Sequence, residues 1–134
     1  MPASKVIDSW AMVAWIQDEP GGTALESLLS KADAGKLQLL MSWYNVAETF
    51  YTVAKRRNLA VAEEFLARLP SLPVRLVLPN EEGIMAAARV KASHSVALGD
   101  AFAIALAQNE GASVITGDQE IRRCKLVPVD WVGT

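Results

Sequence analysis

The chain has 134 residues, of which 51% are hydrophobic and 21% are charged, and its formal net charge is −2. This length predicts one domain with a substantial core, and the charge excludes binding to nucleic acid through a strong overall positive field. A single cysteine, Cys124, and a single histidine, His94, exclude an internal disulfide and a metal site made of Cys/His clusters. No apolar run approaches the roughly 20 residues that a membrane span needs, no signal peptide is visible, and we expect a cytoplasmic protein.

The predicted elements alternate along the chain between short apolar strands and helices. The sequence predicts strands at 5–8, 37–41, 74–78, 113–116 and 125–129. It predicts helices at 9–16, 23–34, 42–58, 61–69, 80–94, 100–107 and 119–123. Ser9, Thr23, Ser42 and Asn80 are the expected helix caps, and Glu19-Pro-Gly-Gly22 is expected to separate the first two helices. Alternation of this kind indicates an α/β domain over residues 1–134, with a parallel sheet covered on both faces.

The helix at 100–107 is central to this organisation. Every residue from Ala101 to Ala107 is apolar, so the helix has no polar face and is expected inside the protein. Asp100 stands at its start, behind Gly99, and the apolar run that follows ends at Thr116-Gly-Asp118. Two acids are thereby expected at the edge of one apolar core, a costly arrangement without a compensating partner.

Two further acids are expected at the same edge. Asp8 ends the first strand, and ligands of open parallel sheets bind beyond the C-terminal ends of the strands. Glu48 lies about two turns into the helix that follows the second strand. Four carboxylates from separate segments are therefore predicted to converge.

Each acid also has an ordinary structural interpretation. Asp8 would bond turn amides, Asp100 would cap its helix, and Glu48 would be an exposed helical residue. Asp118 would be a turn residue, with Thr116 and Gln119 forming a capping box for the short helix. These interpretations weaken when the four positions are taken together, because each lies where an apolar segment reaches the same sheet edge.

Gathered carboxylates repel one another unless a cation neutralises them or some stay protonated. Oxygen-only ligands favour Mg²⁺ or Mn²⁺ over Zn²⁺. Such a site suits phosphoryl chemistry, in which a water activated by the metal attacks a phosphodiester in line. We expect products with a 5′-phosphate and a 3′-hydroxyl.

Four motifs in order resemble the PIN-domain ribonucleases, and most closely the VapC-like toxins of prokaryotic toxin–antitoxin pairs. These motifs are Val6-Ile-Asp8-Ser9, Asn45-Val-Ala-Glu48, Leu98-Gly-Asp100-Ala101 and Thr116-Gly-Asp118. The resemblance runs from about Val6 to Val129, and Glu19-Pro-Gly21 also fits the VapC-like subgroup. One departure is Trp10, where the family more often has a small residue, and this change is expected to reshape the cleft wall or a partner surface.

The resemblance implies a three-layer α/β/α fold with a five-stranded parallel sheet. It implies an endoribonuclease that depends on Mg²⁺ or Mn²⁺, forms a homodimer and is inhibited by a cognate antitoxin protein. By position, Asp8, Glu48 and Asp100 would be the principal metal ligands. Asp118 would be a fourth acid that acts through water or on a second ion, and Thr116 would be a supporting polar group.

Other functions of α/β domains fit these residues less well. A phosphorylated receiver domain needs paired acids after the first strand and an aspartate after the third, whereas Asp8 has no acidic neighbour and the third strand ends at Leu78-Pro-Asn80. A catalytically inactive PIN-like binding module remains the alternative, although the presence of all four acids argues against it. Cleavage of RNA that a chelator abolishes would distinguish the enzyme from the module.

Overall fold

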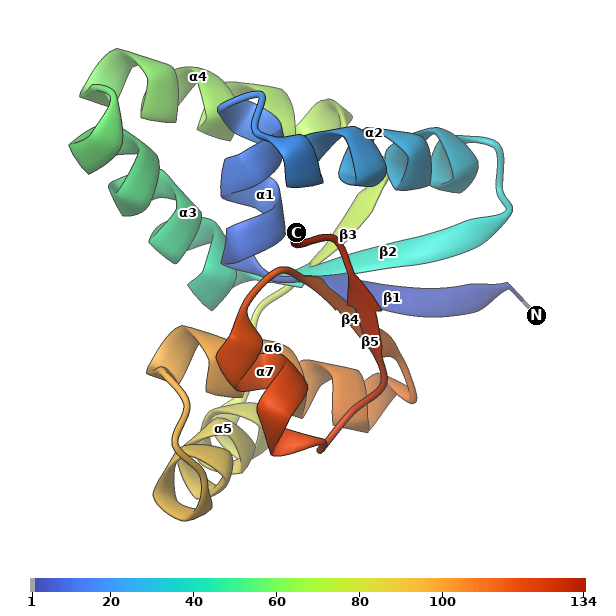
Figure 1. Ribbon diagram of the computed structural model, residues 1–134, viewed down its shortest axis with the longest axis vertical. Helices are drawn as coiled ribbons and strands as arrows, with labels where there is room; N and C mark the ends of the chain where they lie inside the picture. The colour runs from blue at the N-terminus through green and yellow to red at the C-terminus, as the bar shows by residue number, and fades with distance from the viewer. Residues whose placement is uncertain (1) are drawn as a thin grey trace.

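The computed structural model describes residues 2–134, which form a five-stranded parallel sheet between two layers of helices (Figure 1). The strand order is β3-β2-β1-β4-β5, and every neighbouring pair is parallel. The predicted three-layer α/β/α fold is therefore confirmed. The strands are β1 (Ala3–Ile7), β2 (Leu37–Ser42), β3 (Val74–Val77), β4 (Ser113–Thr116) and β5 (Val129–Trp131).

Helices α1 to α4 cover one face of the sheet, and α5 to α7 cover the other (Figure 1). A short 3-10 turn, Leu69–Ser71, follows α4. The helices are α1 (Ser9–Ile16), α2 (Pro20–Asp33), α3 (Trp43–Arg56), α4 (Leu59–Arg68), α5 (Glu81–Ser93), α6 (Leu98–Glu110) and α7 (Gln119–Cys124). None of the helices within residues 2–134 combines the length and apolar character required to cross a membrane.

The central strands are apolar on both faces because each face meets a helical layer. In β1, Val6 packs into the cluster that includes α6, and its neighbour Ile7 packs into the cluster that includes α1 and α2. The same alternation holds in β4, where Val114 and Ile115 are fully buried on opposite sides. Parallel strands buried on both faces are expected to carry adjacent hydrophobic residues, as Val6-Ile7 and Val114-Ile115 are.

The start of the second helix and the cap of the first helix differ from the prediction. The second helix begins at Pro20, not after Thr23, so Gly21 and Gly22 lie in its first turn. Proline suits the first turn of a helix, and Gly22 lets α2 approach α1, because a Cβ there would lie 2.6 Å from the Ala14 carbonyl oxygen. The first helix is capped by Asp8, whose side chain accepts from the amide of Ala11, and Ser9 is its first residue.

The last strand also differs from the prediction. It covers Val129–Trp131 and not 125–129, because residues 125–128 form the C-cap of α7 and a bend. Lys125 takes a left-handed conformation with φ 56° at the end of α7, and the strand begins only after Pro128. The caps predicted at Ser42 and Asn80 are confirmed.

Candidate active site

The C-terminal edge of the sheet brings Asp8 and Asp118 to neighbouring positions. Asp8 follows β1 directly, Asp118 lies two residues after β4, and β1 pairs with β4. The chain adds β2 and β3 on one side of β1 and then crosses to add β4 on the other side. The acids therefore flank the point where the strand order reverses, the usual ligand position in this class of sheet.

Asp8 is buried, with 1% of its surface exposed. Its Oδ1 accepts from the backbone N–H of Ala11 at 2.9 Å, and its Oδ2 accepts from the hydroxyl of Thr116. Burial nevertheless raises the pKa of Asp8 to about 7, with smaller contributions from the charges of Asp118 and Glu48. The side chain of Asp8 therefore caps α1 and also belongs to the group of acids.

Glu48 lies half-buried on α3. This helix packs against α1 and against α6, the helix that carries Asp100. Its Oε1 accepts from the hydroxyl of Ser9 and, at 3.4 Å, from the side-chain amide of Asn45. The same Asn45 amide donates to the carbonyl of Gly99 at 3.0 Å, which links α3 to the first turn of α6. Gly99 has no side chain because the Glu48 carboxylate occupies that space: a Cβ would lie 2.2 Å from Oε1.

Asp100 lies in the first turn of α6, where 7% of its surface is exposed. It does not cap the helix, because the N-cap residue is Ala97. Burial, followed by the negative charge of Asp118, raises the pKa of Asp100 to about 8, and Asp8 and Glu48 add to this effect. Its Oδ2 is buried and has no hydrogen-bond partner among the described residues.

Asp118 is the N-cap of α7 and is half-buried. Its Oδ1 accepts from the backbone N–H of Glu120 at 2.8 Å, and its own N–H donates to the Thr116 hydroxyl at 2.9 Å. Thr116 is therefore not part of a capping box with Gln119. Its hydroxyl instead joins Asp8 to Asp118 and is completely buried.

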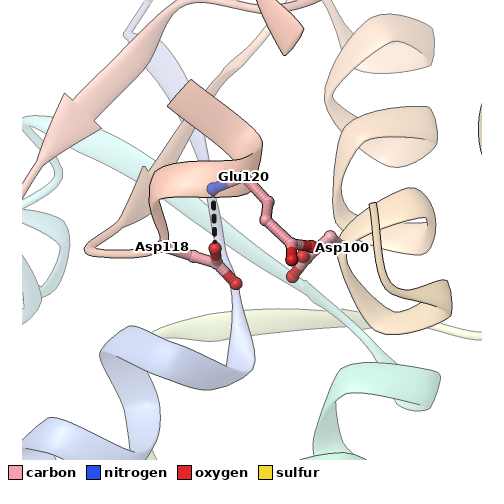
Figure 2. A group of neighbouring side chains, drawn as sticks. All are labelled: Asp100, Asp118 and Glu120. Carbon is pink, nitrogen blue, oxygen red and sulfur yellow. Dashed lines mark hydrogen bonds between the residues drawn. The ribbon is translucent and has the colours of Figure 1, made fainter. Parts of the chain in front are cut away.

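Glu120 was not among the site residues predicted from the sequence. One oxygen from each of Asp100, Asp118 and Glu120 lies within 4.8 Å of the others, and Figure 2 shows the carboxylates of Asp100 and Glu120 side by side. The available signal was a second acid two residues after Asp118, at the start of the predicted short helix.

A cleft of about 440 Å³ opens over this group, and Glu48, Asp100 and Asp118 all line it. Asp8 does not line the cleft, in agreement with its complete burial. Trp10, 38% exposed, forms part of the wall, as the sequence interpretation of this departure anticipated. Arg56 on α3 also lines the cleft and places a positive charge where an anionic ligand would bind.

The residues present fit a hard divalent cation. The donors are carboxylate oxygens without Cys or His, which suits Mg²⁺ or Mn²⁺. The unpartnered buried Oδ2 of Asp100 is a ligand atom without another use, and buried polar atoms are normally satisfied. Within residues 2–134 the ion pairs are Lys5–Asp130 and Arg75–Glu110, so no side-chain cation neutralises the four acids there.

Comparison with known families agrees with this arrangement. The family model of the PIN domain matches residues 5–126. The chain belongs to the PIN domain family. A search of curated proteins finds no sequence that matches.

Solved structures share the fold of this PIN domain at low sequence identity. VapC20 of Mycobacterium tuberculosis, described as a toxin that cleaves the sarcin–ricin loop, superposes with a TM-score of 0.75 at 16% identity, covering 92% of this chain and 96% of that one. FitAcB of Neisseria gonorrhoeae gives 0.70 at 20% identity, with 96% and 97% of the two chains covered. VapBC2 of Rickettsia felis, solved bound to a promoter DNA fragment, gives 0.70 at 14% identity, covering 95% and 97%. The resemblance to VapC-like proteins is thus confirmed for the fold.

Proposed function

We propose that this PIN domain is an endoribonuclease that depends on Mg²⁺ or Mn²⁺ and hydrolyses phosphodiester bonds in RNA. The observation that carries the proposal is the position of Asp100. Its carboxyl group is buried beside three other acids, lines an open cleft, and has an oxygen without a partner. Membership of the PIN domain family and the fold of the VapC-like structures support the assignment.

In this proposal Asp8, Glu48 and Asp100 hold the cation, and Asp118 is a fourth acid that acts through water or on a second ion. A bound Mg²⁺ or Mn²⁺ supplies activation of water and neutralisation of phosphate charge. Thr116 is a positioning residue, because its hydroxyl fixes one oxygen of Asp8.

The chain's own groups keep the acids aligned before a ligand arrives. The N–H of Ala11 and the hydroxyl of Thr116 fix both oxygens of Asp8, and Ser9 and Asn45 hold one oxygen of Glu48. Such preorganisation lowers the reorganisation needed at the reacting phosphate. Because the pKa values of Asp8 and Asp100 are raised, these carboxyl groups are partly protonated near neutral pH. Binding of a cation displaces these protons.

We assign the domain to the toxin side of a toxin–antitoxin pair in the cytoplasm. The neighbours that support this include toxin–antitoxin complexes, among them VapBC of Salmonella typhimurium, solved bound to DNA. A cognate antitoxin protein and a second copy of this chain are the partners in the proposal, and RNA is the substrate.

The proposal is tested with the purified chain, bacterial total RNA and Mn²⁺. We expect cleavage that EDTA abolishes and that leaves 5′-phosphate ends. Asp100→Asn lowers the rate at least about 100-fold, because it removes a charged ligand, and a loss of that size follows even from disrupting outer-shell partners. Asp33→Asn, an equivalent change at an exposed residue ending α2, keeps the parental rate.

Two results would contradict the proposal. The first is a folded Asp100→Asn variant that still cleaves RNA at the parental rate. The second is RNA binding by the parental chain without any product that depends on a divalent ion, which would identify the inactive binding module.

A further inference from the structure

One positively charged side chain lines the otherwise acidic cleft. Within residues 2–134 the lining residues include a single cation, Arg56 on α3, together with four acids: Glu19, Glu48, Asp100 and Asp118. A polyanion that enters this cleft meets a surplus of negative charge, so a cation along its path favours binding. Arginine is well suited to that task, because its planar guanidinium matches the geometry of a phosphate.

Arg56 shares one face of α3 with Glu48. Glu48, Thr52 and Arg56 follow one another at intervals of four residues, and all three line the cleft. Residues at this interval are neighbours on the surface of a helix, and eight residues of helix rise about 12 Å. Helix α3 packs against α6 near the sheet edge and extends away from the sheet (Figure 1). Arg56 therefore lies about two turns beyond Glu48, beside the path of a bound strand and away from the reacting centre.

The guanidinium of Arg56 is available to a ligand. It is exposed, and it takes part in none of the ion pairs or cation–aromatic contacts within the part of the chain that the structure describes. The adjacent Lys55 lies instead over the Tyr51 ring, 5.6 Å from its centre, and Arg57 is the C-cap of α3 and lies outside the cleft lining. Attraction to the helix dipole accounts for cations at the end of a helix, but it does not explain why Arg56 lines the cleft.

We propose that Arg56 binds a phosphate of the RNA strand next to the phosphate held at the acids, and so directs the strand along α3. The inference rests on the proposed function, because it takes RNA as the substrate. A contact to the backbone carries no sequence information, so Arg56 contributes to the affinity for any single strand. Since the contact is made equally before and during the reaction, its loss raises KM and leaves kcat unchanged.

The test is binding of a fluorescein-labelled oligouridylate of about 16 nucleotides, followed by anisotropy in Mn²⁺ at several KCl concentrations. An Asp100→Asn background slows cleavage during the measurement. We expect Arg56→Gln to raise the Kd about tenfold, because it removes a hydrogen bond between charged groups. The slope of log affinity against log salt should become shallower by about 0.7, the value for one phosphate contact on a single strand.

Two further variants separate this contact from a general effect of charge. Arg56→Lys keeps the positive charge, so it retains the salt slope and recovers part of the affinity. Arg57→Gln removes the same charge one residue along α3, outside the cleft, and keeps the parental Kd and slope. In the chain with Asp100 intact, Arg56→Gln raises the KM for bacterial total RNA about tenfold at the parental kcat and Tm.

The inference is overturned if Arg56→Gln binds the oligouridylate with the parental Kd and salt slope, or if Arg57→Gln weakens binding as much as Arg56→Gln does. Its failure is distinct from failure of the proposed function. A parental chain that cleaves RNA while Arg56→Gln keeps the parental KM refutes the phosphate contact alone. A chain that binds the oligouridylate through Arg56 but yields no product in Mn²⁺ supports the contact and refutes the nuclease.

Discussion

Replacing Gly99 with alanine tests whether the position of the Glu48 carboxylate matters for activity. A Cβ on residue 99 would lie 2.2 Å from Glu48 Oε1, 2.3 Å from Oε2 and 2.5 Å from Cδ. An ordinary contact is about 3.4 Å or more, so the carboxylate has to retreat by about 1 Å. Because the obstructing atoms are the end of a flexible side chain, Gly99→Ala is expected to move Glu48 and leave the fold intact.

A displacement of about 1 Å at a reacting centre costs on the order of 100-fold in rate. The free energy of unfolding should rise or stay unchanged, because alanine in a helix is favoured over glycine by up to about 1 kcal/mol. We therefore expect Gly99→Ala to cleave RNA about 100-fold more slowly at an unchanged or higher Tm.

The matched control is Gly83→Ala, in the first turn of α5. A Cβ there would come no nearer than 3.4 Å to any side chain or backbone atom outside its own helix turn. Cleavage of bacterial total RNA in Mn²⁺ and thermal unfolding are measured for both variants. Parental activity in Gly99→Ala with a parental Tm would refute the reasoning, because it would show that Glu48 can leave its position without consequence.

Three further predictions follow from the same site. Burial raises the pKa of Asp8 to about 7 and of Asp100 to about 8, so the folded chain holds more protons than the unfolded chain between about pH 4 and pH 8. Stability of the metal-free protein should fall as the pH rises through this window, lowering the Tm in EDTA by at least about 5 °C between pH 5 and pH 8, and Mn²⁺ should restore it. Thr116→Val removes a donor to Asp8 and should cost about 1–3 kcal/mol in urea unfolding, while moving Mn²⁺ binding to higher pH. Trp10→Ala removes an aromatic wall of the cleft and should raise the KM for RNA about tenfold with little change in kcat, and Trp10→Phe should recover most of the loss.

Each of these predictions has an opposing outcome. A metal-free Tm that rises from pH 5 to pH 8 would mean that Asp8 and Asp100 are not held protonated by burial. Unchanged stability and pH dependence in Thr116→Val would remove Thr116 from the support of Asp8. An effect of Trp10→Ala on kcat alone would indicate that the indole positions the acids and does not contact RNA.

Four of the five strands could be predicted to within a few residues because burial leaves a direct trace in the sequence. Val114 and Ile115 are adjacent apolar residues that pack on opposite sides of the sheet, and such runs mark strands covered on both faces. The five-stranded parallel sheet was implied by the family resemblance, whereas its strand order was not predicted. No pairing signal in β1 itself states that β2 and β4 lie on either side of it.

The start of the second helix shows where local rules were insufficient. Gly21 and Gly22 are typical of a break between helices, yet here they begin α2 because their missing side chains allow close contacts. Gly22 faces the Ala14 carbonyl on α1, and Gly21 faces Trp10. Contacts between helices therefore determine where α2 begins, and such contacts cannot be predicted from a single sequence.

For the candidate site, the edge of the sheet at which the acids lie could be predicted, but not their hydrogen-bond partners. Asp8 and Asp118 were predicted to lie there because each follows the end of a predicted strand. Thr116 was expected to be a supporting polar group, but its bond to Asp8 could not be predicted, because that bond depends on β1 and β4 being neighbours. Glu120 was missed because its importance arises from its approach to α6, which its own helix does not reveal.

The indole of Trp10 has a consequence for how the cleft of this chain can evolve. A Cβ at Gly117 would lie 2.4 Å from the ring, and one at Gly21 would lie 2.6 Å from it. The indole therefore excludes a side chain at position 117, and a smaller residue at position 10 would remove the nearest obstruction there. Position 21 would stay restricted, because a Cβ there also lies 2.9 Å from the Val132 carbonyl oxygen. We therefore expect substrate preference in this cleft to change through paired substitutions. Residue 117 would gain a side chain only after, or together with, loss of the indole at position 10.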